Sequence, residues 1–215
     1  MKTSIGILNY GVGNLLSVQR AFQNCSLDVR IISDAKDAQH ITHMVLPGVG
    51  TYGEVMRQLI HRKLEESIFN HTEKGKPVLG ICVGMQVLTQ TGHENGEHDG
   101  LGLIGGITRS IQQLDPIQGM RVPNIGWTEV EQSEDNRNSV LFADASKSNF
   151  AYFAHSYSVS VTEAGIVTSH VKKSNRQIIS SIEHHNLYGV QFHPEKSGSF
   201  GRKILENFIK KSASL

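Results

Sequence analysis

The stretch LGICVGMQ, from Leu79 to Gln86, decides how the surrounding sequence folds. An apolar run ends abruptly at Cys82, which Gly80 and Gly84 flank, and a helix-like segment follows. A strand that turns sharply into a helix holds the turn residue in a crowded conformation, and flanking glycines relieve the clashes. The pattern predicts a buried strand, a tight turn that exposes Cys82 at its apex, and a helix.

The same alternation runs through the first half of the chain. Short apolar runs at residues 4–8, 27–32, 42–48 and 76–82 alternate with amphipathic segments at residues 14–24, 52–70 and 83–90. Strand–helix alternation predicts an α/β fold whose largely parallel, mixed sheet is flanked by helices.

The second half of the chain has a different pattern. Strand-like segments at residues 149–161, 165–171, 177–184 and 187–194 follow one another closely, which predicts additional antiparallel strands. Residues 198–211 form an amphipathic pattern with Ile204, Leu205, Phe208 and Ile209 on one face, which predicts a closing helix. With no repeat and no long linker, the sequence predicts a single domain over residues 1–215.

Composition excludes several classes of protein. The chain has 215 residues, 38% of them hydrophobic, and a formal net charge of +1, which gives no basic surface for nucleic acid or an anionic membrane. No apolar run reaches the roughly 20 residues that span a bilayer. Cys25 and Cys82 are the two cysteines, and they suggest no disulfide framework. We therefore expect a cytoplasmic protein with reduced thiols.

Cys82 is a candidate nucleophile. The carboxyl edge of an open α/β sheet is where such folds build their sites, and N–H groups at a helix start favour a thiolate or an oxyanion. The alternative is a small buried cysteine at a tight junction, since cysteine is often buried.

His193 is the candidate base among eleven histidines. It ends an apolar run and precedes Pro194, which favours an extended backbone at His193. Residues i and i+2 of an extended segment project to the same side, so Glu195 can orient the imidazole as the third member of a triad. Alone, this segment could be a strand-ending turn, but together with Cys82 it favours nucleophilic catalysis.

Other motifs are less specific. The Pro47–Gly50 loop, PGVG, follows a predicted strand and can present N–H groups to an anion, although an ordinary turn has the same composition. Residues 11–13 resemble the start of a dinucleotide fingerprint, but its sixth position is Leu16, so we expect no nucleotide site. His93 and His98 lack zinc-ligand spacing and are expected in a solvated loop. The sequence predicts no metal and no cofactor.

Four motifs together resemble a known family. PGVG (47–50), GICVGMQ (80–86), HSY (155–157) and GVQFHPEKS (189–197) occur in the order and spacing of a class I, triad-type glutamine amidotransferase. The segments NYGVGNL (9–15), LPGVGTYGEVM (46–56), VPNIGW (122–127) and YFAHSY (152–157) extend the likeness to the glutaminase subunit of imidazole glycerol phosphate synthase.

The resemblance implies a role for each matching residue. Cys82 would attack the side-chain amide of L-glutamine, His193 would move the thiol proton to the leaving ammonia, and Glu195 would hold His193. Backbone N–H groups of Val83 and of Val49 or Gly50 would bind the oxyanion. The implied substrate-binding positions are Gly48, Gly50, Gln86, Glu94, His155, Ser156 and Tyr157.

The resemblance also implies a partner. A cyclase or synthase subunit would form a heterodimer with the chain and receive the ammonia for imidazole glycerol phosphate formation in histidine biosynthesis. The implied interface residues are Tyr10, Asn14, Trp127 and Lys196.

The sequence departs from the family pattern at two positions and leaves alternatives open. Asn124 and Thr128 stand where family members usually have histidine and asparagine. One alternative is a paralogous glutaminase that supplies ammonia for amidino sugars of surface polysaccharide. Another is a different cysteine hydrolase on a similar α/β fold, but such proteins lack the set of Gln86, HSY and HPE.

Overall fold

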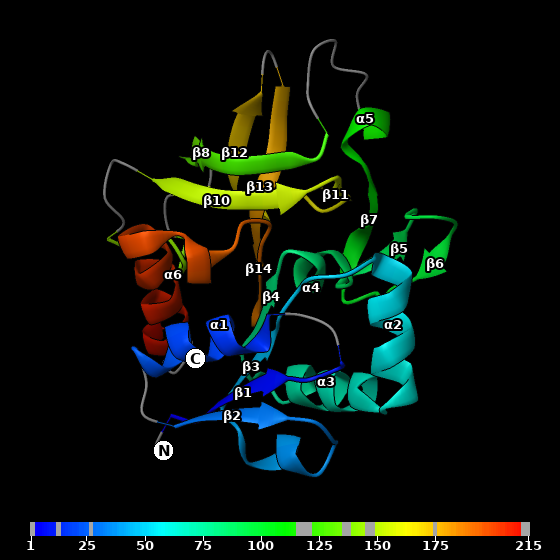
Figure 1. The fold of residues 1–215 in the computed structure, drawn as a ribbon, viewed down its shortest axis with the longest axis vertical. Helices are drawn as coiled ribbons and strands as arrows, with labels where there is room; N and C mark the ends of the chain where they lie inside the picture. Colours follow the sequence, from blue (N-terminus) through cyan, green and yellow to red (C-terminus); the bar gives the residue numbers. More distant parts are fainter. Residues whose placement is uncertain are drawn as a thin grey trace.

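The main sheet contains parallel and antiparallel strands (Figure 1). The computed structural model describes residues 3–11, 14–25, 28–114, 122–134, 139–144, 149–173 and 176–211. Five parallel neighbours come first, in the order β2 (Val29–Ile32), β1 (Ile5–Leu8), β3 (His43–Leu46), β4 (Val78–Ile81) and β14 (Leu187–Val190). The antiparallel strands β13 (Arg176–His184), β12 (Val167–Lys173) and β9 (Glu131–Gln132) follow.

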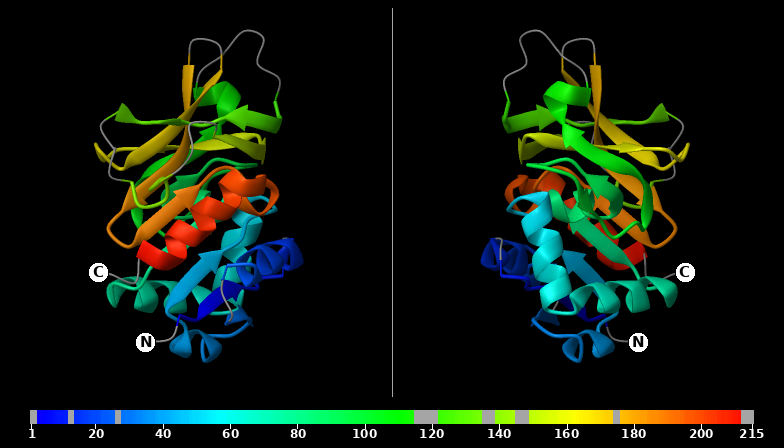
Figure 2. Two further views of the ribbon diagram at one scale, coloured as in Figure 1. Left: turned by 90° about the vertical axis from the view of Figure 1, so that its left-hand side faces the viewer. Right: turned by 90° about the vertical axis from the view of Figure 1, so that its right-hand side faces the viewer.

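Helices cover both faces of this sheet (Figure 2). One face carries α1 (Leu15–Gln23) and α6 (Gly198–Lys211), and the other carries α2 (Tyr52–His61) and α3 (Leu64–Glu73). The apolar face predicted for the closing helix is buried, and Phe208 of α6 stacks edge-on against Phe22 and Tyr188. This packing locks the first and last helices onto the same face.

Strand order brings distant motifs to one edge of the sheet. β4 pairs with β3 on one side and with β14 on the other, all parallel, so the carboxyl ends of the three strands meet. The PGVG loop follows β3, Cys82 follows β4, and His193 follows β14 by three residues. The sheet thus gathers the three motifs that the sequence placed after apolar runs.

Two predicted helices are shorter in the structure. The helix expected over residues 52–70 is divided into α2 and α3, because Lys63 takes a left-handed conformation with φ 55°. The helix expected over residues 83–90 is a single turn, α4 (Val83–Gln86), and β5 (Thr89–Gly92) follows it at once. Helical periodicity therefore extended both predictions beyond a local break in the chain.

Two small sheets stand beside the main one. One pairs β8 (Asn124–Glu129) with β10 (Phe150–His155), and the other contains β11 (Tyr157–Val161), β7 (Ile104–Ser110), β5 and β6 (His98–Asp99). The strand-like segment at residues 149–161 thus divides at Ser156 between two sheets. His98, which we expected in a loop, pairs with Gly92 in a short antiparallel ladder.

The remaining helical elements of the described residues are short: η1 (Asp37–His40), α5 (Ile111–Leu114) and η3 (Pro194–Lys196). Among the described helices, none has the length and apolar composition that crossing a bilayer requires.

Candidate active site

Cys82 occupies a strained turn at the carboxyl end of β4. Its backbone has φ 53° and ψ −110°, a combination that non-glycine residues adopt at a cost of about 1–3 kcal/mol. The Cys82 N–H donates to the Val190 carbonyl oxygen at 2.7 Å, which fixes the turn to β14. The predicted turn is therefore present, and its strain is of the kind that functional sites keep.

The glycines around Cys82 permit close backbone contact. A Cβ atom at Gly84 would lie 2.0 Å from the carbonyl oxygen of Leu46, and one at Gly48 would lie 2.1 Å from that of Ile81 and 2.5 Å from the Val83 nitrogen. Any side chain at either position would force the β3 loop away from the turn. The PGVG loop is thus held directly against the backbone that presents Cys82.

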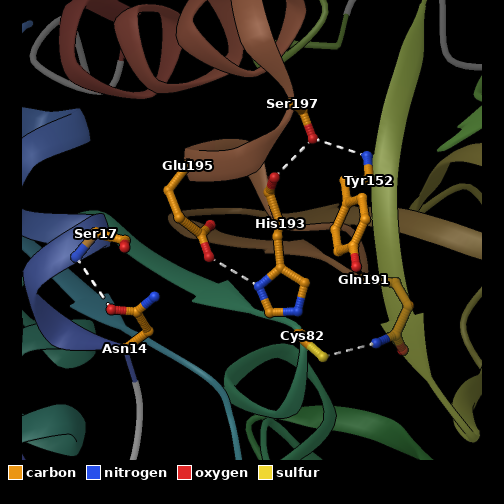
Figure 3. A network of polar contacts seen from close by, with 8 residues as sticks. All are labelled: Asn14, Ser17, Cys82, Tyr152, Gln191, His193, Glu195 and Ser197. Carbon is orange, nitrogen blue, oxygen red and sulfur yellow. Dashed lines mark hydrogen bonds and ion pairs between the residues drawn. The ribbon is translucent and has the colours of Figure 1, made fainter. Parts of the chain in front are cut away.

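His193 and Glu195 form a buried pair beside Cys82 (Figure 3). The Nδ1 atom of His193 lies 2.9 Å from Oε1 of Glu195, and each side chain is 3% exposed. Burial lowers the pKa of His193, but hydrogen bonds with Cys82 and Glu195 outweigh it and raise the pKa to about 9. The arrangement can hold a proton on the imidazole next to a nucleophilic sulfur.

The backbone of His193 is fixed on the side away from the sulfur. Its N–H donates to the Tyr152 carbonyl oxygen at 2.8 Å, and its own carbonyl oxygen accepts from the Ser197 hydroxyl at 2.6 Å. The same hydroxyl accepts from the Tyr152 N–H at 2.9 Å (Figure 3). β10 therefore positions the imidazole together with the loop after β14.

A cavity of about 210 Å³ opens beside the sulfur. It is lined by Gly50, Cys82, Val83, Gln86, Glu94, Pro123, Ile125, Ala154, His155, Ser156 and Tyr157. The volume is below the roughly 300–1,000 Å³ of pockets for drug-sized ligands, so it suits a molecule of amino-acid size. Most residues named from the sequence as substrate-binding positions are thus brought together.

Gln86 and Glu94 reach the cavity from different elements. Gln86 ends α4 and is buried, with its Nε2 3.0 Å from the Tyr157 carbonyl oxygen. Glu94 follows β5 and accepts the Tyr52 N–H at 2.7 Å, so it caps the start of α2. Gly48 and Val49 do not line the cavity, and Val49 is partly exposed.

The residues expected at a partner interface divide into two groups. Trp127 is 57% exposed and lies on β8, Asn14 is exposed at the start of α1, and Lys196 is exposed with its Nζ 5.4 Å from the centre of the Tyr152 ring. Tyr10 is different, because it is fully buried and offers no surface for contact. Burial raises the pKa of Tyr10, with Cys82 as a second cause.

The two departures from the family pattern face inward. Asn124 is buried and contacts His155, and the Thr128 hydroxyl accepts from Lys173 Nζ at 3.3 Å. The intervening residues Ile125 and Trp127 are the exposed ones, as alternation along β8 requires. The departures therefore lie on the face of β8 turned away from solvent.

Comparison with known proteins assigns the family. The model of glutamine amidotransferase class-I matches residues 7–212. This chain belongs to the class I glutamine amidotransferase family. Over 210 residues it is 37% identical to imidazole glycerol phosphate synthase subunit HisH of Aquifex aeolicus, with 97% of each chain covered. The HisH subunit of Caldanaerobacter subterraneus is 37% identical over 204 residues, covering 95% of this chain and 96% of that subunit.

Solved structures agree on the fold. PurLQS from Thermotoga maritima superposes with a TM-score of 0.75 at 18% identity, covering 98% of this chain and 99% of that chain. The crystal structure of another glutamine amidotransferase gives a TM-score of 0.71 at 14% identity, covering 98% of this chain and 99% of that chain. The predicted α/β class and the resemblance to an amidotransferase of the HisH type are confirmed.

Sequence reasoning missed one residue at the centre of this amidotransferase site. Gln191 is fully buried, and its Nε2 lies 3.5 Å from the Cys82 sulfur. It is two residues before His193, so the i, i+2 rule that placed Glu195 beside the imidazole also applied to Gln191.

Proposed function

We propose that this amidotransferase is a glutaminase subunit, in which a triad of Cys82, His193 and Glu195 hydrolyses L-glutamine to glutamate and ammonia. The observation that carries the proposal is a buried imidazole–carboxylate pair next to a cysteine on a strained turn (Figure 3), beside an amino-acid-sized cavity. Membership of the family supplies the substrate class.

Each triad residue has one part in the reaction. Cys82 loses its proton to His193, and its sulfur attacks the side-chain amide carbon of glutamine. His193, whose pKa of about 9 keeps it protonated at neutral pH, gives the proton to the leaving ammonia. Water then attacks the thioester with His193 as base, which releases glutamate and restores the thiol. Glu195 keeps Nδ1 paired throughout, so that Nε2 faces the sulfur.

The negative oxygen of the tetrahedral intermediate needs donors on the side opposite His193. The N–H of Val83 and an N–H of Val49 or Gly50 are the candidates, because the PGVG loop packs against the turn that contains Val83. One such donor typically contributes about 10²–10³ in rate. Gln86, Glu94, His155, Ser156 and Tyr157 would then hold the amino-acid end of the substrate in the cavity.

The ammonia would pass to a cyclase subunit that forms a heterodimer with this chain. The similar HisH proteins are subunits of imidazole glycerol phosphate synthase. This similarity supports a role for the present chain in imidazole glycerol phosphate formation, within histidine biosynthesis in the cytoplasm. Exposed Ile125, Trp127 and Phe150 form an apolar patch on β8 and β10 next to the cavity, and Lys196 adds a charge beside it. The family model matches residues 7–212, which supports a single amidotransferase domain over residues 1–215.

The test is glutamate release by the purified chain with its cyclase partner and the acceptor substrate. Cys82→Ala should lose activity by several orders of magnitude without loss of fold, because alanine removes the sulfur that attacks the amide carbon. Cys25→Ala is the matched control and should be silent, since Cys25 lies just after α1 and its thiol donates to the Ala21 carbonyl oxygen. Substantial turnover in Cys82→Ala would refute the mechanism.

A further inference from the structure

Gln191 lies directly opposite Cys82 across the β4–β14 pair. Val190 is the register partner of Ile81, so the residues that follow, Gln191 and Cys82, are level with one another. The Nε2 atom of Gln191 approaches the sulfur, and its Oε1 lies 3.1 Å from Gln86 Nε2. Figure 3 shows Gln191 and His193 reaching the sulfur from different directions.

The direction of these hydrogen bonds follows from one backbone carbonyl. Gln86 Nε2 faces the oxygen of Tyr157, which can only accept, so Gln86 must present its amino group there. The same amino group faces Gln191, which must therefore turn its oxygen toward Gln86. The remaining end of the Gln191 amide is a donor, and it faces the sulfur of Cys82.

A second donor fixes the Tyr157 carbonyl in place. The Nδ1 atom of His155 lies 2.8 Å from the same oxygen and must carry the hydrogen. Burial lowers the pKa of His155 to about 4, so the ring is neutral and its Nε2 accepts from Asn124 Nδ2 at 2.9 Å. The carbonyl thus receives two donors, and the chain of contacts from Asn124 to Cys82 has only one consistent polarity.

We infer that Gln191 is a further residue acting on the nucleophile: its amide N–H donates to the Cys82 sulfur and stabilises the thiolate, and Gln86 sets the orientation of that amide. The inference rests on the proposed function only in taking Cys82 as the nucleophile. When the thiol proton moves to His193, the negative charge left on sulfur has a fixed donor on a second side. A hydrogen bond to a charged group is stronger than one to a neutral group, so this donor favours the reactive form.

The experiment measures the alkylation rate of Cys82 by iodoacetamide against pH in the isolated full chain, without glutamine or partner. A Cys25→Ser background leaves one thiol to react. Gln191→Met keeps the length of the side chain but removes the donor, and it should move the pH midpoint of alkylation upward by about one pH unit. Gln86→Met should move the midpoint in the same direction but less far, because the Gln191 amide is then free to turn.

Gln90→Met is the matched control, since Gln90 is exposed and its Oε1 accepts the Gly106 N–H away from the sulfur. Its midpoint should equal that of the parent. An unchanged midpoint in folded Gln191→Met overturns the inference; if that variant does not fold, an unchanged midpoint in Gln86→Met overturns it instead. Failure of the proposed function is distinguishable, because it appears as absent glutaminase activity in the wild-type complex and leaves the alkylation midpoints as they are.

Discussion

Replacing Glu195 by glutamine tests the triad most directly, because it replaces one carboxylate oxygen by an amino group and keeps the size and shape of the side chain. In the wild type, contacts with Cys82 and Glu195 raise the pKa of His193 from 6.5 to about 9 despite its burial. That difference corresponds to about 3 kcal/mol in favour of the protonated imidazole. Both side chains are almost completely buried, so solvent does not weaken the contact.

Two effects of Glu195→Gln act in the same direction. The loss of charge removes the part of this stabilisation that Glu195 supplies to the protonated His193, while the part supplied by Cys82 remains. The whole of about 3 kcal/mol, or about 10²-fold in rate, is therefore the upper limit of this effect. The new amide can also donate to Nδ1, and the hydrogen then sits on Nε2, where the thiol proton must arrive. We expect kcat to fall by about 10²–10⁴-fold.

The assay is glutamate release in the complex with the cyclase partner, with thermal unfolding as the check on folding. Glu195→Asp keeps the charge but shortens the reach and should lose less activity than Glu195→Gln. Glu97→Gln is the silent control, since the side chain of Glu97 is 75% exposed. If folded Glu195→Gln keeps more than half of the wild-type kcat, then Glu195 does not orient or stabilise His193.

Three further outcomes are expected. Burial lowers the pKa of His43, His71 and His155 to about 4, so between pH 6.5 and 4 the unfolded chain binds up to three more protons than the native chain. The free energy of unfolding should therefore fall by up to about 4 kcal/mol per pH unit on acidification, and His71→Gln should reduce the slope of urea-derived values against pH by about a third. Gly84→Ala should destabilise the fold by about 3 kcal/mol in the same urea titration, because its Cβ would meet the backbone of β3. Gly102→Ala would meet no other atom and should cost only about 1 kcal/mol, because the φ of 61° at Gly102 is unfavourable for alanine. Trp127 is the only tryptophan of the chain and is largely exposed, so its fluorescence should shift to the blue when the cyclase partner binds. Trp127→Ala should weaken partner binding at least about tenfold. An unshifted spectrum at saturation would contradict docking on β8.

Patterns of apolar residues within short segments predicted most strands of the main sheet and the closing helix. The apolar runs became β1, β3, β4 and β14, and the closing segment became α6 with its apolar face buried. The errors arose where a single residue changed the backbone. Lys63 in the left-handed region divides one predicted helix, and the turn after Gln86 shortens another. Apolar periodicity continues through both positions, so the pattern contains no sign of either break.

Placement of the site residues depended on contacts between distant parts of the chain. Tyr10 was expected at the partner interface because it lies in the segment NYGVGNL (9–15), which resembles the family, but the structure buries its side chain completely. In the sequence, Asn124 stood out only as a departure from the family pattern. Its contact with His155 requires β8 to pair with β10. Neither outcome can be read from the neighbouring residues, because each depends on which strands become adjacent.

By itself, the sequence determined the chemistry of this protein: a cysteine between two glycines at the end of an apolar run, and a histidine with a glutamate two residues later. Both are short-range features, since steric crowding at a turn and the alternation of an extended chain act within a few residues. The tertiary structure alone decided that β14 lies beside β4 in a register that sets Gln191 against Cys82, 109 positions apart in the chain. That choice depends on the burial and pairing of whole strands, which no local segment encodes, and it gives the Gln191 amide its direction toward the sulfur.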